Sequence, residues 1–525
     1  MSRHGERPAD PSADSRSAYD YTGGKVKRPA MVQDLRARVE GDVRFDEYTK
    51  QLYATDASAY EVTPIGVVYP TGTADVSAVL EYCSARSVPV LPRGGGTSLA
   101  GQTVNEAVVL DCTRYMDTVL EVDADERVAR AQPGVILGEL DDELAARGLK
   151  FAPDPAWGDK SALGGAIGNN STGSHSLAYG KTDAYLESCE AVLADGTVTE
   201  FGETAIDEIH RRADRGPHAT PEERIYAAVG DILEERETIQ TAFPDLKRNV
   251  SGYNLDRLVA DAETGTVNLA RLLAGSEGTL AVITEATVSL EPIPATKAVA
   301  LLRYETLSDA MADVAPVVEH GPAAVEVLDD VLLDLARETA EFGPLVAEMV
   351  PQHIAAVLLV EFYADSDTAG KQQVADLLAD RCPGATTNVA AAGSGRTATA
   401  SPTRAVSASE AHGPRERKQF WKLRKSGLPI LLSRTTDAKH ASFIEDVAVP
   451  PAALPAFVTD FQEILADHDT FASFYGHAGP GCLHVRPLVD TKGVEGIETM
   501  RAISDAVTDL AVEYGGSVSG EHGDG

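Results

Sequence analysis

The segment Arg93-Gly94-Gly95-Gly96-Thr97-Ser98-Leu99-Ala100-Gly101-Gln102 directly follows a short apolar run at 88–91. Three consecutive glycines let the backbone adopt positive φ and approach a ligand closely. Successive N–H groups in such a loop converge on an anion, and Thr97 and Ser98 add hydroxyl donors. No Gly-Lys-Ser/Thr follows, as a Walker loop requires, and the glycine spacing and the lack of a long following helix differ from the Rossmann fingerprint. The segment therefore predicts a cradle for a diphosphate, with an ordinary glycine turn as the alternative.

Two further glycine-rich segments favour the cradle over the ordinary turn. Residues 161–173 read SALGGAIGNNSTG, a second stretch in which small residues dominate. Residues 275–286 read GSEGTLAVITEA, a glycine turn that feeds an apolar strand. Three such segments in one chain indicate one extended ligand site rather than three unrelated turns.

The sequence around the first glycine loop predicts an α/β unit. Strands are expected at 67–70, 88–91 and 107–110, with a helix over 71–86. That helix has one apolar face at the i, i+3, i+4, i+7 spacing, formed by Val76, Val79, Leu80 and Cys83. Strand, helix and strand joined by short links favour a right-handed crossover.

The rest of the chain predicts two or three domains, because 525 residues exceed what one hydrophobic core holds. Asp195-Gly196 is typical of a hairpin turn, and 221–240 is charged and helical. Beyond Glu291-Pro292-Ile293-Pro294 the pattern predicts strands at 298–303 and 355–363 and helices at 307–319 and 328–337. The expected divisions are a disordered tail at 1–30, a helical entry at 31–61, a ligand-binding domain at 62–294, and a second domain at 295–525 with a flexible insert at 384–412.

Composition excludes several classes of protein. The net charge of −35 and the lack of a basic block argue against nucleic-acid binding. No apolar run reaches the length of a membrane helix, and 1–30 lacks the apolar centre of a secretory signal. The five cysteines form no CxxC pair, so neither an iron–sulfur cluster nor a disulfide framework is expected. We expect a cytoplasmic protein, and the scarcity of Lys beside Arg suggests a salt-rich cytoplasm.

Histidines near the end of the chain form a second constellation. His477 and His484 are separated by the turn Gly479-Pro480-Gly481, which folds the two imidazoles toward each other, and Glu521-His522 adds a carboxylate and another imidazole. Two neutral histidines and one glutamate with an open position are typical of a catalytic divalent-metal site. Hydrogen-bonded structural histidines are the alternative.

The three glycine segments, with Pro153-Asp154-Pro155 between the first two, resemble the vanillyl-alcohol oxidase and p-cresol methylhydroxylase superfamily. Their order is similar to that of the branch that oxidises D-lactate, glycolate and D-2-hydroxyglutarate, over roughly residues 55–525. The resemblance implies an α+β fold: a two-subdomain FAD-binding domain of the p-cresol methylhydroxylase type, plus an α/β cap domain with an antiparallel sheet. Thr97 stands where some relatives have a histidine that attaches FAD, so FAD is expected to bind without a covalent bond.

The resemblance also implies which residues contact FAD. The first loop would hold the pyrophosphate, the second stretch would run beside the pyrophosphate and flavin, and the third would close over the adenosine end. The implied FAD contacts are Arg93, Gly94, Gly95, Gly96, Thr97, Ser98, Gly101, Gln102, Pro153, Asp154, Gly164, Gly165, Asn169, Ser171, Thr172, Gly173, Glu277, Gly278 and Ile283.

For the histidine cluster, the resemblance implies His477, His484 and Glu521 as metal ligands and His522 as the general base. Zinc is the expected metal, with manganese or iron as alternatives. The usual relatives have Asp-Gly-Asn where this chain has Pro480-Gly481-Cys482, and this departure bears on the geometry of the turn. With this turn the chain is similar to the longer subgroup of relatives, which are fused to an iron–sulfur segment.

A basic patch completes the expected site. The resemblance places Arg424 on the substrate carboxylate, which a guanidinium can bind through two hydrogen bonds. Lys439 or His440 would hold a second carboxylate or steady the metal-bound hydroxyl. Tyr253 and Asn254 are weaker candidates for the wall of the site.

Together these features predict an FAD-dependent dehydrogenase for a small D-2-hydroxy acid. Its electrons would pass to an iron–sulfur domain or subunit, expected in sequence beyond residue 525, and peripheral association with the inner face of the membrane is compatible with that role. The alternatives are an alkyl-glycerone-phosphate synthase, in which the flavin undergoes no net redox change, and a flavin-carrying electron-transfer subunit without its own substrate.

Overall fold

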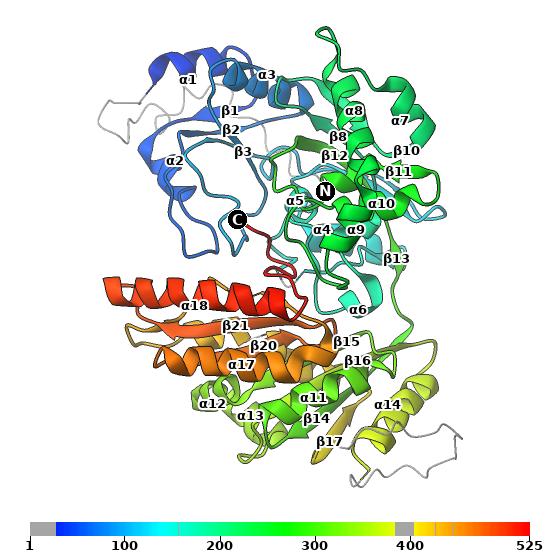
Figure 1. Cartoon of the computed structure of the whole chain (residues 1–525), viewed down its shortest axis with the longest axis vertical. Coiled ribbons are helices and arrows are strands. Elements are labelled where there is room, and N and C mark those ends of the chain that lie inside the picture. Colours follow the sequence, from blue (N-terminus) through cyan, green and yellow to red (C-terminus); the bar gives the residue numbers. More distant parts are fainter. Residues whose placement is uncertain (1–27, 156, 384–403, 426, 445) are drawn as a thin grey trace.

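A computed structural model describes residues 28–525 except 156, 384–403, 426 and 445, and it divides into two lobes (Figure 1). Most of the expected tail at 1–30 and of the insert at 384–412 therefore lies outside the described residues. The upper lobe holds the chain up to β13, and the lower lobe begins at β14. The fold is α+β, as the sequence predicts.

The first sheet of the upper lobe is the predicted α/β unit. Its strand order is β1 (Asp42–Arg44), β2 (Gly66–Tyr69), β4 (Val108–Asp111) and β3 (Val90–Arg93), with β2 and β3 both parallel to β4. Helix α3 (Thr73–Ser84) follows β2, and its four predicted apolar residues are all buried. The first glycine loop therefore leaves the end of β3, at the edge of this sheet.

The second sheet of the upper lobe is antiparallel, in the order β5-β6-β12-β8-β9. Strands β8 and β9 form the predicted hairpin, and Gly196 takes a φ of 89° at its turn. The third glycine segment feeds β12, the central strand. The five strands are β5 (Val119–Asp123), β6 (Val128–Ala131), β8 (Leu186–Val192), β9 (Val198–Phe201) and β12 (Val282–Ser289).

Helices and short strand pairs surround these two sheets. The charged segment 221–240 is helical, as the sequence predicts. The helices are α1 (Pro29–Arg36), α2 (Glu47–Leu52), α4 (Leu137–Ala145), α5 (Leu163–Gly168), α6 (Ser176–Tyr179), η1 (Thr182–Tyr185), α7 (Ile206–Arg212), α8 (Pro221–Glu234), α9 (Arg236–Ala242), α10 (Leu255–Ala262) and η2 (Leu269–Leu272). The short strands are β7 (Leu149–Lys150), β10 (Glu203–Ala205), β11 (Thr266–Asn268) and β13 (Glu291–Pro292).

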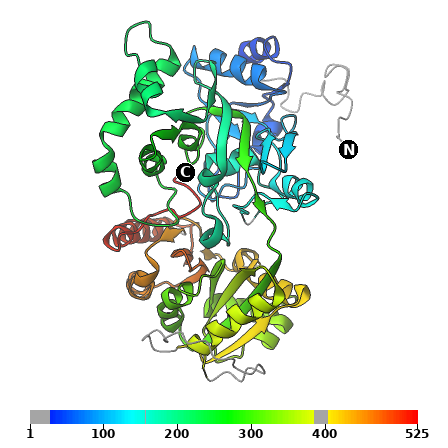
Figure 2. The same cartoon turned by 90° about the vertical axis from the view of Figure 1, so that its right-hand side faces the viewer.

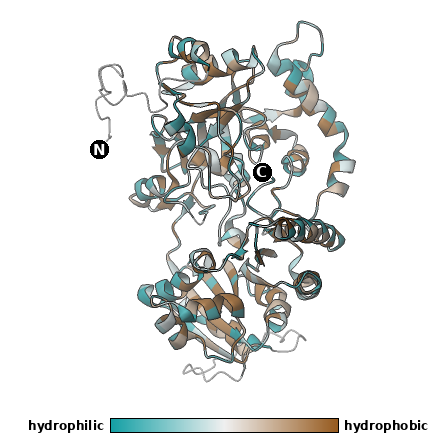
Figure 3. Ribbon diagram, turned by 90° about the vertical axis from the view of Figure 1, so that its left-hand side faces the viewer, coloured by the Kyte–Doolittle hydropathy of each residue, from teal (hydrophilic) through white to brown (hydrophobic). Residues whose placement is uncertain are grey.

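The lower lobe contains one antiparallel sheet with the order β17-β14-β16-β15-β20-β21-β18, and β19 also pairs with β21. In Figure 3 hydrophobic colour is concentrated on this sheet and on the helix sides that face it. The strands are β14 (Thr296–Tyr304), β15 (Ala324–Asp329), β16 (Ala356–Ala364), β17 (Ser407–Ala411), β18 (Lys439–His440), β19 (Val447–Ala448), β20 (Ala472–His477) and β21 (Cys482–Val489).

Helices cover both faces of this sheet. One face packs against α11 (Leu307–Val318), α14 (Asp367–Arg381), α17 (Leu454–Asp467) and α18 (Val494–Glu513). The other packs against α12 (Asp330–Glu338), α13 (Gly343–Met349), α15 (Pro414–Lys425) and α16 (Gly427–Leu432). A 3-10 turn, η3 (Pro451–Ala453), precedes α17. Among the described residues, no helix is long and apolar enough to span a membrane.

Two sequence expectations for the lower lobe need correction. Residues 407–411 fall inside the expected flexible insert, but they form β17, an edge strand paired with β14. Small Ala and Ser side chains made this segment look like a loop, whereas an edge strand needs backbone pairing more than large side chains. The expected helix at 328–337 is α12, and the strand β15, which runs directly into it, was not predicted.

The last residues of the chain return to the upper lobe. Figures 1 and 2 show the segment after α18 rising from the lower lobe to end beside the glycine loops. Val250 N donates to Ser519 O at 3.1 Å and Gly520 N donates to Asp446 O at 2.7 Å, so this segment is attached to both lobes. It therefore carries Glu521 and His522 into the junction between the lobes.

We expect Asp313→Ala to destabilise the lower lobe strongly. Asp313 is fully buried on α11, where it accepts hydrogen bonds from Arg381 Nε at 3.0 Å and from Tyr304 OH at 2.8 Å. Its removal leaves the buried guanidinium of Arg381 with only the more distant carboxylate of Asp380, at 3.7 Å, and the loss of the buried partner costs about 3–5 kcal/mol. Urea unfolding followed by circular dichroism measures this loss.

Asp437→Ala is the matched control for that variant. Asp437 pairs with Lys492 at 2.5 Å, but the two side chains are 71% and 74% exposed. An exposed pair contributes about 1 kcal/mol or less. Equal losses in the two variants would show that burial of the Asp313 pair is not what makes it important.

Candidate functional site

A cavity in the upper lobe is lined by all three glycine segments. Of the residues predicted to contact FAD, the following line it: Arg93, Gly94, Gly95, Gly96, Thr97, Ser98, Gln102, Gly164, Gly165, Asn169, Ser171, Thr172, Gly173, Glu277, Gly278 and Ile283. Gly101, Pro153 and Asp154 are not part of its lining, although Pro155 is. His477, Glu521 and His522 line the same cavity, so the glycine loops and the histidine cluster form one site.

The first loop needs glycine because it packs against the second segment. A Cβ on Gly95 would lie 1.9 Å from the carbonyl oxygen of Lys160, and one on Gly94 would lie 2.9 Å from Ala162 Cβ. At Gly165 and Gly168, by contrast, a Cβ would meet nothing within 4 Å. The backbone of the second segment is therefore bare on the side where a ligand can approach.

The amide of Gln102 joins the three glycine segments. Its Nε2 donates to Asn169 Oδ1 at 3.1 Å and to Glu277 Oε1 at 3.2 Å, and it also contacts the carbonyl oxygen of His522. Arg93 has a similar structural role, because its guanidinium donates to the carbonyl oxygens of Thr55 and Thr103, both at 2.9 Å. These contacts hold the loop open as a preformed cradle.

The histidine cluster is built on the hairpin of β20 and β21. The rings of His477 and His484 lie 5.1 Å apart, as the intervening turn predicts. Glu521 Oε1 lies 3.1 Å from His477 Nε2, 3.1 Å from His484 Nε2 and 3.5 Å from His522 Nε2. Three imidazole nitrogens thus lie around one carboxylate oxygen. Histidine nitrogens together with a carboxylate oxygen are the kinds of donor that a divalent-metal site uses.

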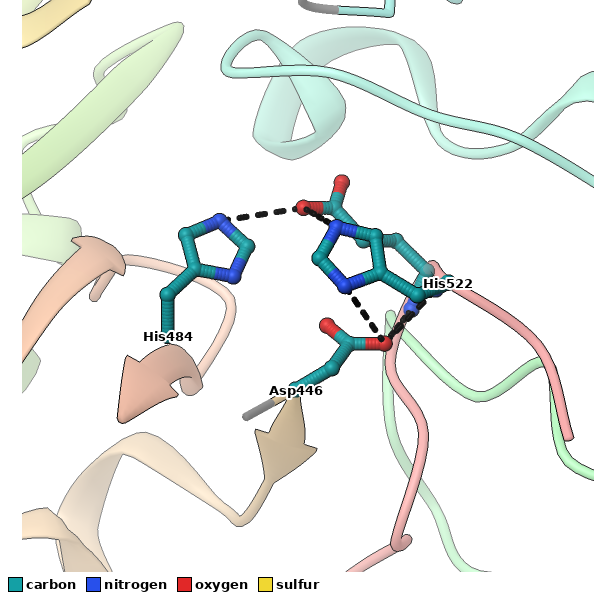
Figure 4. A group of neighbouring side chains, drawn as sticks. Asp446, His484 and His522 are labelled. Carbon is teal, nitrogen blue, oxygen red and sulfur yellow. Dashed lines mark hydrogen bonds and ion pairs between the residues drawn. The ribbon is translucent and has the colours of Figure 1, made fainter. Parts of the chain in front are cut away.

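Asp446 is a residue of this site that sequence reasoning missed. Figure 4 shows its carboxylate beside His522 and across from His484, and the ligand atoms of Asp446, His484, Glu521 and His522 all lie within 4.8 Å of one another. Its Oδ2, however, already accepts hydrogen bonds from the backbone N–H groups of Glu521 at 2.7 Å and His522 at 2.6 Å, and from Ser519 Oγ at 2.9 Å. We therefore interpret Asp446 as the anchor of this turn.

Arg248 sets the charge of Glu521. Arg248 is fully buried, and its Nη1 donates to Glu521 Oε2 at 2.7 Å. Burial alone would raise the pKa of Glu521, but Arg248 and the histidines hold it well below its usual range. Burial also lowers the pKa of His484. An ionised carboxylate beside a neutral imidazole is the protonation state that binds a metal.

Glu326 is a second residue that the sequence did not indicate. It is fully buried on β15, and its two oxygens contact Arg424 Nε at 2.5 Å and His477 Nδ1 at 2.8 Å. Burial opposes its ionisation, yet Arg424 and His477 lower the pKa of Glu326 to about 2. An acceptor on Nδ1 leaves His477 Nε2 free to face Glu521, which is the tautomer a metal ligand needs.

The structure does not bring Lys439 to this group. Lys439 is exposed, contacts the carbonyl oxygen of Arg434, and pairs with Val489 at the far end of β21 from His484. His440 is buried there, with Nδ1 2.8 Å from the carbonyl oxygen of Arg486. The pair Lys439 and His440 forms the short strand β18, which is held against the end of β21 rather than against the histidine cluster.

The two weaker wall candidates also have other partners. Tyr253 is 43% exposed, and its hydroxyl lies 3.0 Å from Thr279 Oγ1. Asn254 Nδ2 donates to Asp183 Oδ2 and to the carbonyl oxygen of Arg271, both at 3.1 Å. Neither residue is part of the cavity lining.

Two family models match the chain. The FAD binding domain matches residues 64–202, and the C-terminal domain of FAD linked oxidases matches residues 293–525. The first match covers the first two glycine segments, and the second covers the whole histidine cluster.

Relatives of known name align with nearly the whole chain. The D-lactate dehydrogenase of Archaeoglobus fulgidus is 31% identical over 488 residues, which are 92% of this chain and 86% of that protein. A D-2-hydroxyglutarate dehydrogenase of Pantoea ananatis is 31% identical over 505 residues, which are 94% of this chain and 48% of that protein. The chain thus spans about half the length of that relative.

Solved structures support the fold alone, because their identities are low. An alkyldihydroxyacetonephosphate synthase superposes with a TM-score of 0.63 at 18% identity, covering 94% of this chain and 80% of the other. p-Cresol methylhydroxylase with substrate bound superposes with a TM-score of 0.59 at 14% identity, covering 95% and 91%. The expected fold, a p-cresol methylhydroxylase-type FAD domain with a cap, is confirmed.

We expect Gly95→Ala to weaken FAD binding by at least about tenfold. The new Cβ would collide with the carbonyl oxygen of Lys160, and displacing packed backbone costs about 1–3 kcal/mol. The ratio of flavin to protein absorbance after purification and dialysis measures the loss. Gly72→Ala is the control, because a Cβ there meets nothing within 4 Å and the backbone is extended. Full flavin content in Gly95→Ala would contradict this account of the cradle.

Proposed function

Because the chain belongs to the family of FAD-linked oxidases that includes D-lactate and D-2-hydroxyglutarate dehydrogenases, we propose that it oxidises a small D-2-hydroxy acid to the 2-oxo acid. The observation that carries the proposal is the convergence of His477, His484 and His522 on Glu521 in the wall of the flavin cavity. D-Lactate and D-2-hydroxyglutarate are candidate substrates because the two relatives above are named for them, and glycolate is a third because glycolate oxidase subunits also align with this chain.

The cofactor would be held without a covalent bond, with residues 62–294 as the FAD-binding domain and 295–525 as the substrate domain. The first loop has no histidine, and Thr97 Oγ1 lies 3.1 Å from Ser161 Oγ instead. The bare backbone at Gly165 and Gly168 supports this assignment, because a flat ring system can lie against it. Gly101, Pro153 and Asp154 would support the cradle from outside its lining.

The metal ligands would be His477, His484 and Glu521. Their nitrogen and oxygen donors fit zinc, and manganese or iron accept the same set. Arg248 compensates the charge of Glu521 on the side opposite the histidines, so both oxygens of that carboxylate have a partner. When bound, FAD supplies the hydride acceptor, and the metal supplies Lewis acidity to the substrate hydroxyl.

The remaining roles fall to His522 and Arg424. His522 lines the cavity, is 17% exposed and is oriented by Asp446, so it is placed to take the hydroxyl proton. Arg424 would bind the substrate carboxylate through its two terminal amino groups, because Glu326 contacts its Nε side. The proton thus goes to His522, and the α-hydrogen leaves with its electron pair.

The electrons would then pass to an iron–sulfur domain or subunit. The five cysteines of this chain are buried, and none lies in a cluster-binding spacing. Peripheral contact with a membrane quinone pool is compatible with such a partner.

Anaerobic mixing with each D-2-hydroxy acid tests the proposal. We expect one of them to bleach the visible flavin absorption of the metal-loaded protein, with its L-enantiomer inert where one exists. In His522→Ala we expect bleaching to slow by about a hundredfold or more, with FAD and metal retained, since general-base catalysis contributes about 10²–10⁴ in rate. A flavin that no hydroxy acid bleaches would contradict the dehydrogenase and favour the electron-transfer subunit. Unchanged bleaching in His522→Ala would remove its role as base.

We expect Glu326→Gln to weaken two kinds of binding at once. Glu326 contacts both His477 and Arg424, so its loss should lower metal affinity by about 10–100-fold and raise the KM for the hydroxy acid. Metal titration of the chelator-treated protein and steady-state kinetics measure the two effects separately. Asp437→Ala, which removes an exposed ion pair, is the control for effects of mutation and chelator treatment that do not involve the site. A loss of only one kind of binding would show that Glu326 does not support both residues.

A further inference from the structure

Glu361 is a second buried carboxylate on the face of the lower sheet that α12, α13, α15 and α16 cover. It lies on β16 opposite Ala324 of β15, and Ala324 is two residues from Glu326 on the same face of its strand. Its side chain is about 2% exposed. Two acidic side chains therefore occupy neighbouring strands beneath the helix that carries Arg424.

Three donors from different elements meet on Glu361. His175 Nε2 lies 2.9 Å from Oε1, Lys297 Nζ lies 3.3 Å from the same oxygen, and Trp421 Nε1 donates to Oε2 at 2.6 Å. Lys297 is on β14 and Trp421 on α15, both in the lower lobe, whereas His175 belongs to the upper lobe. Glu361 thus joins the two lobes through a charge-assisted hydrogen bond.

His175 is continuous with the wall of the flavin cavity. Thr172 and Gly173 line that cavity, and His175 follows two residues later. The imidazole packs against two aromatic rings: it stacks on Tyr363 with 5.5 Å between centroids, and its ring centroid lies 5.4 Å from that of Trp421. Its Nδ1 lies 3.8 Å from Asp154 Oδ2. A shift of the 172–175 segment would therefore be transmitted to Glu361.

Glu361 and Glu326 together fix the roll of α15. Trp421 and Arg424 are three residues apart on this helix and so lie on one face. Trp421 is held by Glu361 and Arg424 by Glu326. If the first contact is lost, only the Glu326 bond and the apolar packing of α15 remain, so the guanidinium of Arg424 is held less strictly in one orientation.

We propose that His175 is a positioning residue that acts through Glu361 and Trp421 to orient Arg424 toward the substrate carboxylate. The contacts run from the flavin-cavity wall to the carboxylate-binding arginine, so the cofactor-bound lobe aligns the substrate-bound helix. This inference rests on the proposed function for its kinetic effect, but not for its effect on α15.

The test compares His175→Asn with Trp421→Phe and His320→Asn. Trp421→Phe removes the indole N–H and keeps an aromatic ring. His320→Asn is the matched control, because His320 Nε2 lies 3.0 Å from Asp380 Oδ2 beside α11 and α14, on the opposite face of the same sheet. Hydrogen exchange of residues 414–425 reports the order of α15, and kinetics of flavin reduction report KM and kcat.

We expect His175→Asn and Trp421→Phe to speed hydrogen exchange in α15 and to raise KM by about tenfold. A tenfold change corresponds to the free energy of about one hydrogen bond to a charged group. The limiting rate should change less than about twofold, and flavin and metal content should stay at wild-type values. His320→Asn should alter neither α15 exchange nor KM. Combining His175→Asn with Trp421→Phe should add little to either single effect.

Unchanged exchange in α15 of His175→Asn would overturn the inference, whatever the substrate. A fall in the limiting rate or in flavin content with KM unchanged would also overturn it, because it would assign His175 to the cofactor instead. If wild-type flavin is not reduced by any hydroxy acid, the proposed function fails, while the exchange measurement still decides whether His175 orders α15.

Discussion

The carboxylate of Glu521 is the point on which the rest of the site depends. One oxygen faces three imidazoles and the other is bound by Arg248, a guanidinium with no access to solvent. Burying these charges together is tolerable only because each has a partner, and removal of any one would leave an uncompensated charge in a low-dielectric interior. The cluster also spans the molecule: the histidines of the β20–β21 hairpin come from the lower lobe and Arg248 from the upper. Docking of the lobes and formation of the site are therefore one event.

Sequence reasoning succeeded where function imposes a local pattern. Gly95 passes within contact distance of the Lys160 backbone and Gly94 within contact distance of Ala162, so the close packing is visible in the sequence as a run of glycines. His477 and His484 lie on the two arms of one short hairpin, so their spacing alone predicted their contact. Helix α3 and its buried face followed from periodicity in the same way. The roles of these histidines in metal binding and catalysis stay predictions.

Sequence reasoning failed where a residue gains its importance from a distant partner. Glu326, Asp446 and Arg248 stand in ordinary strands or loops, and nothing near them in the chain marks them as different from the many acidic and basic residues of a protein with net charge −35. Their roles in the site come from contacts with residues that lie 75 to 273 positions away in the sequence. Lys439 is the reverse case: it was suggested as a substrate ligand, but the strand β18 that carries it pairs with the far end of β21 from His484, and its role stays a prediction.

The amide of Gln102 has a consequence for folding order. It contacts residues 67, 175 and 420 positions further along the chain. Forming the cradle therefore requires very long loops of the chain to close. Such contacts form late, because the chain entropy lost in closing the loop must be offset by structure already present. During synthesis, the cradle cannot reach its final form until residue 522 has left the ribosome, long after the first glycine loop is made. The cradle is therefore completed only at a stage when both lobes already exist to hold its parts together.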